Sequence, residues 1–120
     1  MKAQPTEMPV EFEGGGVEIR GAEWGDMHVA QYTLAPGTDL TPFFTVLRDG
    51  LCSGNHWGTV LAGELQVRYS DGTLETTRAG EHFFWPAGHT AWTDGGVAFL
   101  AVTPMHEVRD MNEQMAAASG

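Results

Sequence analysis

The chain has 120 residues, with six Lys and Arg against sixteen Asp and Glu, and a formal net charge of −10 at pH 7. This length suits one domain with one core, and the negative charge argues against nucleic acid and against anionic membranes as partners. The sequence has no apolar run of membrane-spanning length, no secretion signal, and a single cysteine, Cys52, so we expect a cytoplasmic protein without disulfides.

Residues 1–16 contain two prolines and three consecutive glycines, and we expect an arm that is disordered or pairs with a neighbour. Beyond the arm, glycine-rich turns separate short segments rich in β-branched and aromatic residues, which is typical of strands. The Asp71-Gly72 pair is the strongest sequence signal for a hairpin turn, since glycine accepts a positive φ. Strands are predicted over residues 17–20, 27–34, 40–46, 56–62, 64–69, 73–78, 81–85, 89–93 and 97–103.

The C-terminal segment changes character. Over residues 107–118, Val108, Met111, Met115 and Ala118 repeat with the period of a helix, which predicts a short amphipathic helix packed on the outer wall of the β domain. The predicted organisation is therefore an N-terminal arm (1–16), an all-β barrel (17–104), and a C-terminal helix and tail (105–120).

A spaced set of turn residues carries a family resemblance. Gly63 closes a run that begins at His56, and Gly80, Pro86 and Gly88 follow at fixed intervals. This spacing resembles the two signature motifs of the cupin family, with the likeness extending over about residues 25–104. The resemblance implies a double-stranded β-helix, or jelly-roll, barrel whose inward-facing side chains usually hold a metal.

The motif positions of the usual metal ligands are mostly changed here. Aligning the first motif on Gly63 puts His56 at the family's Glu ligand, and Cys52 and Gly50 at its two His ligands. In the second motif the family's His falls on Ala91, but His89 lies two residues earlier. Because side chains alternate along a strand, residues 89 and 91 face the same way, so His89 is a candidate displaced ligand.

Cys52, His56 and His89 thus form a candidate set of one thiolate and two imidazoles, suited to one divalent transition metal such as Zn, Fe, Ni or Mn. His82 is an alternative imidazole ligand if its face of the strand is the lumen, and otherwise a surface histidine. His28 and His106 lack motif context, and for them we expect solvent or a structural hydrogen bond.

Three functions stay open at this point. The first is a metal-dependent enzyme of the dioxygenase, isomerase or lyase type acting on a small organic molecule in the barrel. The second is a metal-free enzyme in which His56 is the catalytic base, as in the sugar epimerases of the cupin superfamily. The third is a metal-free barrel that binds or senses a small molecule without chemistry.

The resemblance also implies a homodimer, since small cupins commonly pair, often through an N-terminal strand.

Overall fold

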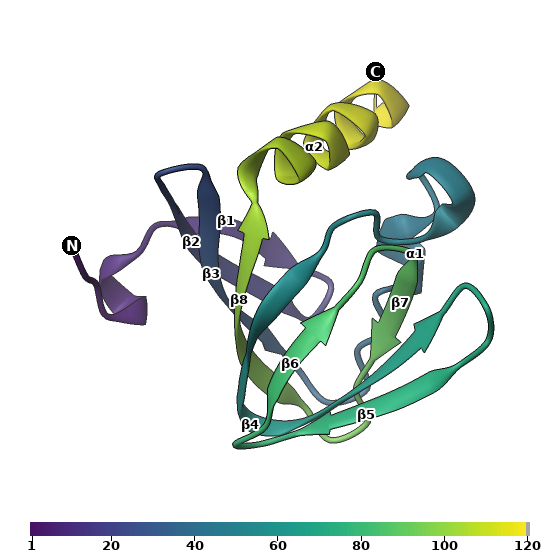
Figure 1. Ribbon diagram of the computed structural model, residues 1–120, viewed down its shortest axis with the longest axis horizontal. Helices are drawn as coiled ribbons and strands as arrows, with labels where there is room; N and C mark the ends of the chain where they lie inside the picture. Colours follow the sequence, from purple (N-terminus) through teal and green to yellow (C-terminus); the bar gives the residue numbers. More distant parts are fainter. Residues whose placement is uncertain (120) are drawn as a thin grey trace.

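The computed structural model describes residues 1–119, and residue 120 of the predicted tail lies outside the described residues. It is an antiparallel β-barrel with one long helix across an end (Figure 1). This confirms the predicted all-β class with a C-terminal helix. The strands are β1 (Val10–Gly14), β2 (Val17–Trp24), β3 (Met27–Leu34), β4 (His56–Tyr69), β5 (Leu74–Arg78), β6 (His82–Trp85), β7 (His89–Trp92) and β8 (Val97–Pro104). The helices are the 3-10 turns η1 (Pro5–Glu7) and η2 (Arg48–Gly50), and the α-helices α1 (Thr41–Phe44) and α2 (Met105–Ser119).

Strand β4 joins the two sheets of the barrel. Its first half pairs with β8 and β6, and its second half pairs with β5 and β7. The sequence predicted two strands here, separated at Gly63. The structure has one strand of 14 residues, with Gly63 at a φ of 74° between its halves. A Cβ at this position would lie 2.0 Å from the backbone oxygen of Gly96, so glycine is required for the close approach of β8.

The N-terminal arm contains a strand that the sequence analysis missed. β1 pairs antiparallel with β2 of the same chain and forms the edge of the sheet order β1-β2-β3-β8-β4-β5. Each of its five residues is exposed, so no alternation of buried and exposed side chains marked it as a strand. It nevertheless brings Glu11 and Phe12 to the mouth of the barrel, where both line the cavity described below.

The strand predicted over residues 40–46 is wrong, because this segment forms the short helix α1. Pro42 lies in its first turn, where a missing N–H costs nothing. Asp39 accepts a hydrogen bond from the backbone N–H of Thr41 at 2.9 Å, which starts the turn. A short apolar run such as Phe43-Phe44 suits a strand or a helical turn equally well, so periodicity alone did not decide between them.

The core fills the barrel between the sheets. Trp85 is 2% exposed and stacks on Phe83 with ring centroids 3.5 Å apart, while Phe99 meets its ring edge-on at 5.1 Å. The Trp85 indole N–H donates to the Thr77 hydroxyl at 3.2 Å, so this buried polar group is satisfied. Burial of these rings fixes the register of β6 against β4. In this register Trp85 pairs with His56, the first residue of β4, so the core also fixes the position of His56.

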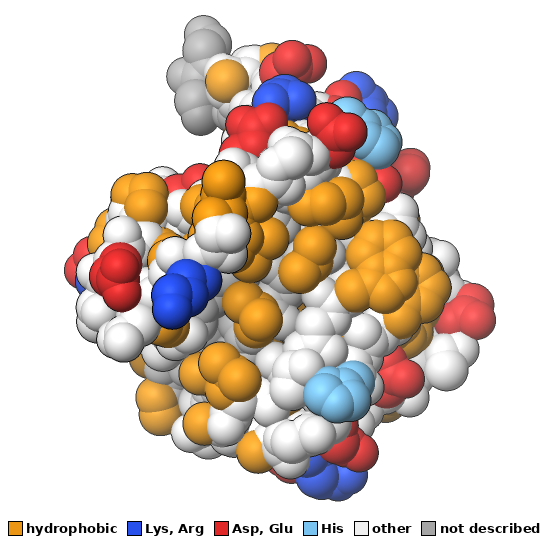
Figure 2. Space-filling model, turned by 60° about the vertical axis from the view of Figure 1, so that its left-hand side comes forward, with side chains coloured by type: hydrophobic (Ala, Val, Ile, Leu, Met, Phe, Trp, Pro, Cys, Tyr) orange, Lys and Arg blue, Asp and Glu red, His pale blue; other side chains and the backbone are white. Residues whose placement is uncertain are grey.

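Helix α2 lies across the open end of the barrel (Figure 1). The sequence predicted that this helix packs on the outer wall, and that prediction is wrong. Arg48 forms a bidentate ion pair with Asp110, at 2.9 and 3.2 Å, and Arg109 forms an ion pair with Glu23. The apolar face of α2 turns toward the barrel interior. In the space-filling view, hydrophobic side chains gather beneath the C-terminal helix (Figure 2).

No helix in the described part of the chain has both the length and the apolar character needed to cross a membrane.

Candidate metal centre and cavity

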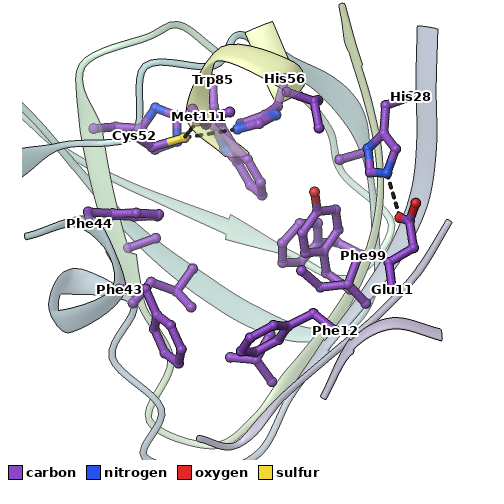
Figure 3. Close-up of a pocket in the computed structure, with 18 of the residues that line it drawn as sticks. Glu11, Phe12, His28, Phe43, Phe44, Cys52, His56, Trp85, Phe99 and Met111 are labelled. Atoms are coloured by element: carbon purple, nitrogen blue, oxygen red, sulfur yellow. Dashed lines mark hydrogen bonds and ion pairs between the residues drawn. The ribbon is translucent and has the colours of Figure 1, made fainter. Parts of the chain in front are cut away.

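A cavity of about 330 Å³ occupies the end of the barrel beneath α2. Its walls are mainly aromatic and aliphatic, and its polar groups are few. Cys52, His56 and Met111 gather at one end, while Phe12 and Phe43 lie at the other (Figure 3). Such a concave apolar space with a small convergent polar group is typical of a small-molecule site.

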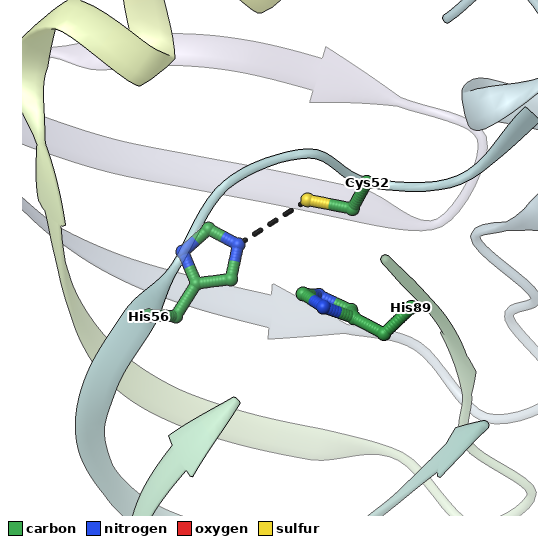
Figure 4. A group of neighbouring side chains, drawn as sticks. All are labelled: Cys52, His56 and His89. Atoms are coloured by element: carbon green, nitrogen blue, oxygen red, sulfur yellow. Dashed lines mark hydrogen bonds between the residues drawn. The ribbon is translucent and has the colours of Figure 1, made fainter. Parts of the chain in front are cut away.

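The cavity wall brings together three of the four residues that the sequence nominated as ligands. Cys52 comes from the loop before β4, His56 from the start of β4, and His89 from the start of β7. Their ligand atoms all lie within 4.8 Å of one another, and the side chains point toward a common space (Figure 4). The Cys52 Sγ lies 3.3 Å from the His56 Nε2, and the two imidazole centroids are 5.4 Å apart.

The backbone holds Cys52 against His89. The Cys52 N–H donates to the His89 carbonyl at 2.8 Å, and the Gly88 N–H donates to the Cys52 carbonyl at 2.8 Å. The two residues therefore face each other as an isolated antiparallel bridge. Gly88 is one of the turn residues of the second motif. A turn that the sequence predicted therefore fixes the position of the Cys52 thiol.

Asn55 ties the site to α2. Its backbone N–H and side-chain amide both donate to Glu107 of α2, the former at 2.7 Å. Its side-chain oxygen accepts a hydrogen bond from the Ala87 N–H at 3.0 Å. Asn55 precedes His56 directly, so this one side chain links the start of β4, the β6–β7 turn and the helix that covers the cavity.

Each imidazole has a hydrogen-bond partner that fixes its orientation. The His89 Nδ1 lies 2.7 Å from the Pro86 carbonyl, which only accepts, so Nδ1 carries the proton and Nε2 keeps a free lone pair. The His56 Nδ1 lies 2.6 Å from the Thr103 hydroxyl, with Thr103 fully buried. A partner on the far nitrogen is what a ligating histidine ordinarily has.

Burial sets the protonation of the cluster. It lowers the pKa of His56 to about 3, with His89 and His28 adding repulsion, and burial also lowers the pKa of His89. Both imidazoles are therefore neutral near pH 7, as metal binding requires. Burial raises the pKa of the Cys52 thiol to about 11, so a metal would have to displace the proton from this sulfur.

The residues fit a metal ion. The cluster offers one thiol and two neutral imidazoles, each imidazole held by a hydrogen bond, a donor set suited to a late transition metal. Gly50, at the family's first His position, contributes no ligand atom. Ala91 lines the cavity wall as an apolar residue, so His89 is the only imidazole that the second motif places there.

His82 does not join the cluster. Its side chain is exposed, and its Nδ1 lies 2.7 Å from the Thr59 hydroxyl on the outer face of the sheet. Alternation along β6 sends Trp85 inward and His82 outward, so the prediction that His82 is a further ligand does not agree with the structure.

The cavity wall also holds a carboxylate–imidazole pair that was not predicted from the sequence, in which the imidazole is buried and the carboxylate is exposed. His28 is 5% exposed, and its Nε2–H donates to the Glu11 carboxylate at 2.6 Å. Its Nδ1 is buried without a hydrogen-bond partner. The two residues come from β3 and β1, which pair with β2 from opposite sides, so no local motif signalled the contact. The expectation of a structural hydrogen bond at His28 is confirmed, but its place in the cavity wall was not foreseen.

Comparison with known proteins identifies the fold. No family model matches the sequence, and no curated protein matches it. The structure is similar to an RmlC-like cupin from Shewanella frigidimarina NCIMB 400, with a TM-score of 0.63 and 18% identity over 85% of this chain and 88% of that one. It is also similar to the polyketide cyclase RemF from Streptomyces resistomycificus, with a TM-score of 0.64 and 18% identity over 88% and 79% of the two chains. A cupin superfamily protein from Desulfitobacterium hafniense DCB-2 has a TM-score of 0.59 and 16% identity over 80% and 84%.

These likenesses confirm the predicted jelly-roll barrel. The chain has the fold of a small cupin, and it carries a His/Cys cluster that could hold a metal.

Proposed function

We propose that Cys52, His56 and His89 hold one transition metal ion, and that the chain binds and transforms a small organic molecule beside it. The observation that carries this proposal is the meeting of three ligand atoms within 4.8 Å at the wall of an apolar cavity. The two neutral imidazoles and the thiol have the donor types that suit a metal.

The shape and lining of the cavity suggest the class of molecule. A space of about 330 Å³ walled by Phe12, Phe43, Trp85 and Phe99 suits a mainly aromatic or aliphatic body. Cys52 and His56 lie at one end of the cavity and Phe43 at the other (Figure 3), so the molecule would place an oxygen-bearing group toward His56 and its apolar part toward Phe43.

The metal, when bound, would supply Lewis-acid or electron-transfer chemistry at the His56 end of the cavity. The protein's own contribution is orientation and exclusion of water. Thr103 and the Pro86 carbonyl hold the two imidazoles, and α2 closes the cavity over the cluster. We propose dioxygenase, isomerase or lyase chemistry for this centre, and the similar fold of a polyketide cyclase shows that such a barrel can house an enzyme.

The direct test is the metal content of the purified, untagged protein, measured by inductively coupled plasma mass spectrometry. We expect close to one transition metal per chain in the wild type, and loss of that metal in His56→Ala and in His89→Ala. His82→Ala is the matched control, because it removes an imidazole from the outer face and should leave the metal in place.

An absence of metal in the wild type after supplementation of the growth medium would refute the proposal. So would metal that is retained in both His56→Ala and His89→Ala, since the cluster would then not be the site.

The second candidate is metal-free acid/base catalysis, and one specific contact favours it. The Glu11–His28 pair in the cavity wall is the arrangement that orients an imidazole for proton transfer. Turnover of a substrate that survives removal of metal by a chelator, but is lost in His28→Gln, would favour this reading over the metal centre.

We further propose that the protein is a cytoplasmic homodimer. Trp57 and Phe84 stack with centroids 4.9 Å apart, yet they are 45% and 49% exposed on the outer face of the barrel. Exposed aromatic pairs of this kind are frequent at interfaces. Multi-angle light scattering should give twice the chain mass, and a monomer at micromolar concentration would refute the dimer.

A further inference from the structure

A second sulfur atom lies beside the candidate metal centre. The Met111 Sδ is 3.8 Å from the Cys52 Sγ, although the two residues are 59 positions apart in the chain. Met111 belongs to α2 and reaches down from the helix that closes the cavity (Figure 3). Gly54 makes room for it, since a Cβ at that position would lie 2.8 Å from the methyl carbon of Met111.

The spacing of the two sulfurs fits one shared ion. With metal–sulfur bonds of about 2.3 Å, two sulfurs 3.8 Å apart subtend an angle of about 110° at the metal, which is close to tetrahedral. The Cys52 Sγ and the His56 Nε2, at 3.3 Å, subtend about 100° with ordinary bond lengths. Cys52 is therefore close enough to each of Met111 and His56 to share an ion with it.

The resulting donor set is softer than the three-residue cluster alone. Thioether sulfur is a poor ligand for Fe(II), Mn(II) and Zn(II), whereas thiolate and thioether ligands together favour copper, and Cu(I) above all. Two imidazoles, one thiolate and one weak thioether are a combination that proteins use for copper.

We propose that Met111 is a fourth ligand and that the centre is a copper site made by Cys52, His56, His89 and Met111. This inference rests on the proposed metal centre and specifies its metal. Because Met111 is carried by α2, bound copper would also attach the helix to the barrel directly over the cavity.

Affinity for Cu(II) alone is a weak test, since that ion outcompetes other divalent ions at most nitrogen and sulfur sites. The sharper test compares Cu(I) and Zn(II) in matched variants of the full chain. Cu(I) affinity is measured anaerobically by competition with bicinchoninate, and Zn(II) affinity by competition with a chromophoric chelator. Met111→Leu keeps the volume of the side chain and removes the sulfur. Met105→Leu makes the same change elsewhere on α2, also in the cavity wall, and is the control.

We expect Met111→Leu to weaken Cu(I) binding by tenfold or more and Zn(II) binding by less than twofold, with Met105→Leu close to wild type for both metals. Unchanged Cu(I) affinity in Met111→Leu, or an equal loss for both metals, would overturn the copper assignment and leave Met111 as a packing residue. In either of those cases the proposed metal centre would stand. If the wild type binds neither Cu(I) nor Zn(II), the metal centre itself is overturned, and the copper assignment with it.

Discussion

The hydrogen bond between Thr103 and His56 allows a quantitative test of how the cluster is held. Thr103 is fully buried, and its hydroxyl lies 2.6 Å from the His56 Nδ1. Thr103→Val keeps the shape of the side chain but leaves that nitrogen buried without a partner. An unpaired buried polar group costs about 1–3 kcal/mol, so the free energy of unfolding should fall by about that amount.

The same substitution should weaken metal binding, because an unheld imidazole loses its orientation toward the ion. Loss of such a supporting hydrogen bond ordinarily costs about 10- to 100-fold in metal affinity. Stability is measured by urea unfolding of the metal-free protein, and affinity by competitive metal titration.

Thr93→Val is the matched control for this effect. Thr93 is 1% exposed, and its hydroxyl donates to the Glu64 carbonyl at 2.8 Å and accepts from the Gly96 N–H at 3.0 Å, away from the cluster. It should destabilise the fold without changing metal affinity. If Thr103→Val lowers stability while metal affinity stays within twofold of wild type, the Thr103 hydrogen bond does not hold His56 for metal binding.

Two further predictions concern stability. Gly63→Ala combines a positive φ with a clash against Gly96, whereas Gly72 has a φ of 89° and nothing within 4 Å of an added Cβ. Urea unfolding should therefore show a loss of about 1–2 kcal/mol for Gly72→Ala and a clearly larger loss for Gly63→Ala, and equal losses would refute the close approach. Burial holds the pKa of His56 at about 3, below its ordinary value of 6.5, so the unfolded chain binds more protons between these pH values. The stabilisation is complete above pH 6.5 and is lost as the pH falls toward 3. Between pH 7 and pH 5 the metal-free wild type should lose about 2 kcal/mol more than His56→Gln, and parallel pH profiles would contradict the low pKa.

The fold was largely predictable because its signals are local. Turn residues such as Gly72, Gly80 and Gly88 carry positive φ angles where the sequence predicted turns. The errors arose where local signals are ambiguous or absent. Residues 40–46 are apolar without a decisive period, and β1 has no buried face to alternate with an exposed one.

The candidate site was partly predictable from spacing. The two motif frames and strand alternation nominated Cys52, His56 and His89, which the barrel brings together. Alternation along β6 alone could have placed the His82 side chain in the barrel lumen or on the outer face. Because Trp85 is buried in the lumen and lies on the opposite face of β6, His82 lies on the outer face. Contacts between distant elements, such as Met111 with Cys52, follow from how α2 closes the barrel and leave no local pattern in the sequence.

The most direct test of the metal centre is anomalous X-ray diffraction from crystals of the metal-loaded protein, collected on both sides of the metal absorption edge. A metal bound at this cluster should give one strong anomalous peak enclosed by the Cys52 Sγ and the Nε2 atoms of His56 and His89. A peak at exposed histidines alone, such as His82, or well-ordered density at the cluster without an anomalous signal, would contradict it.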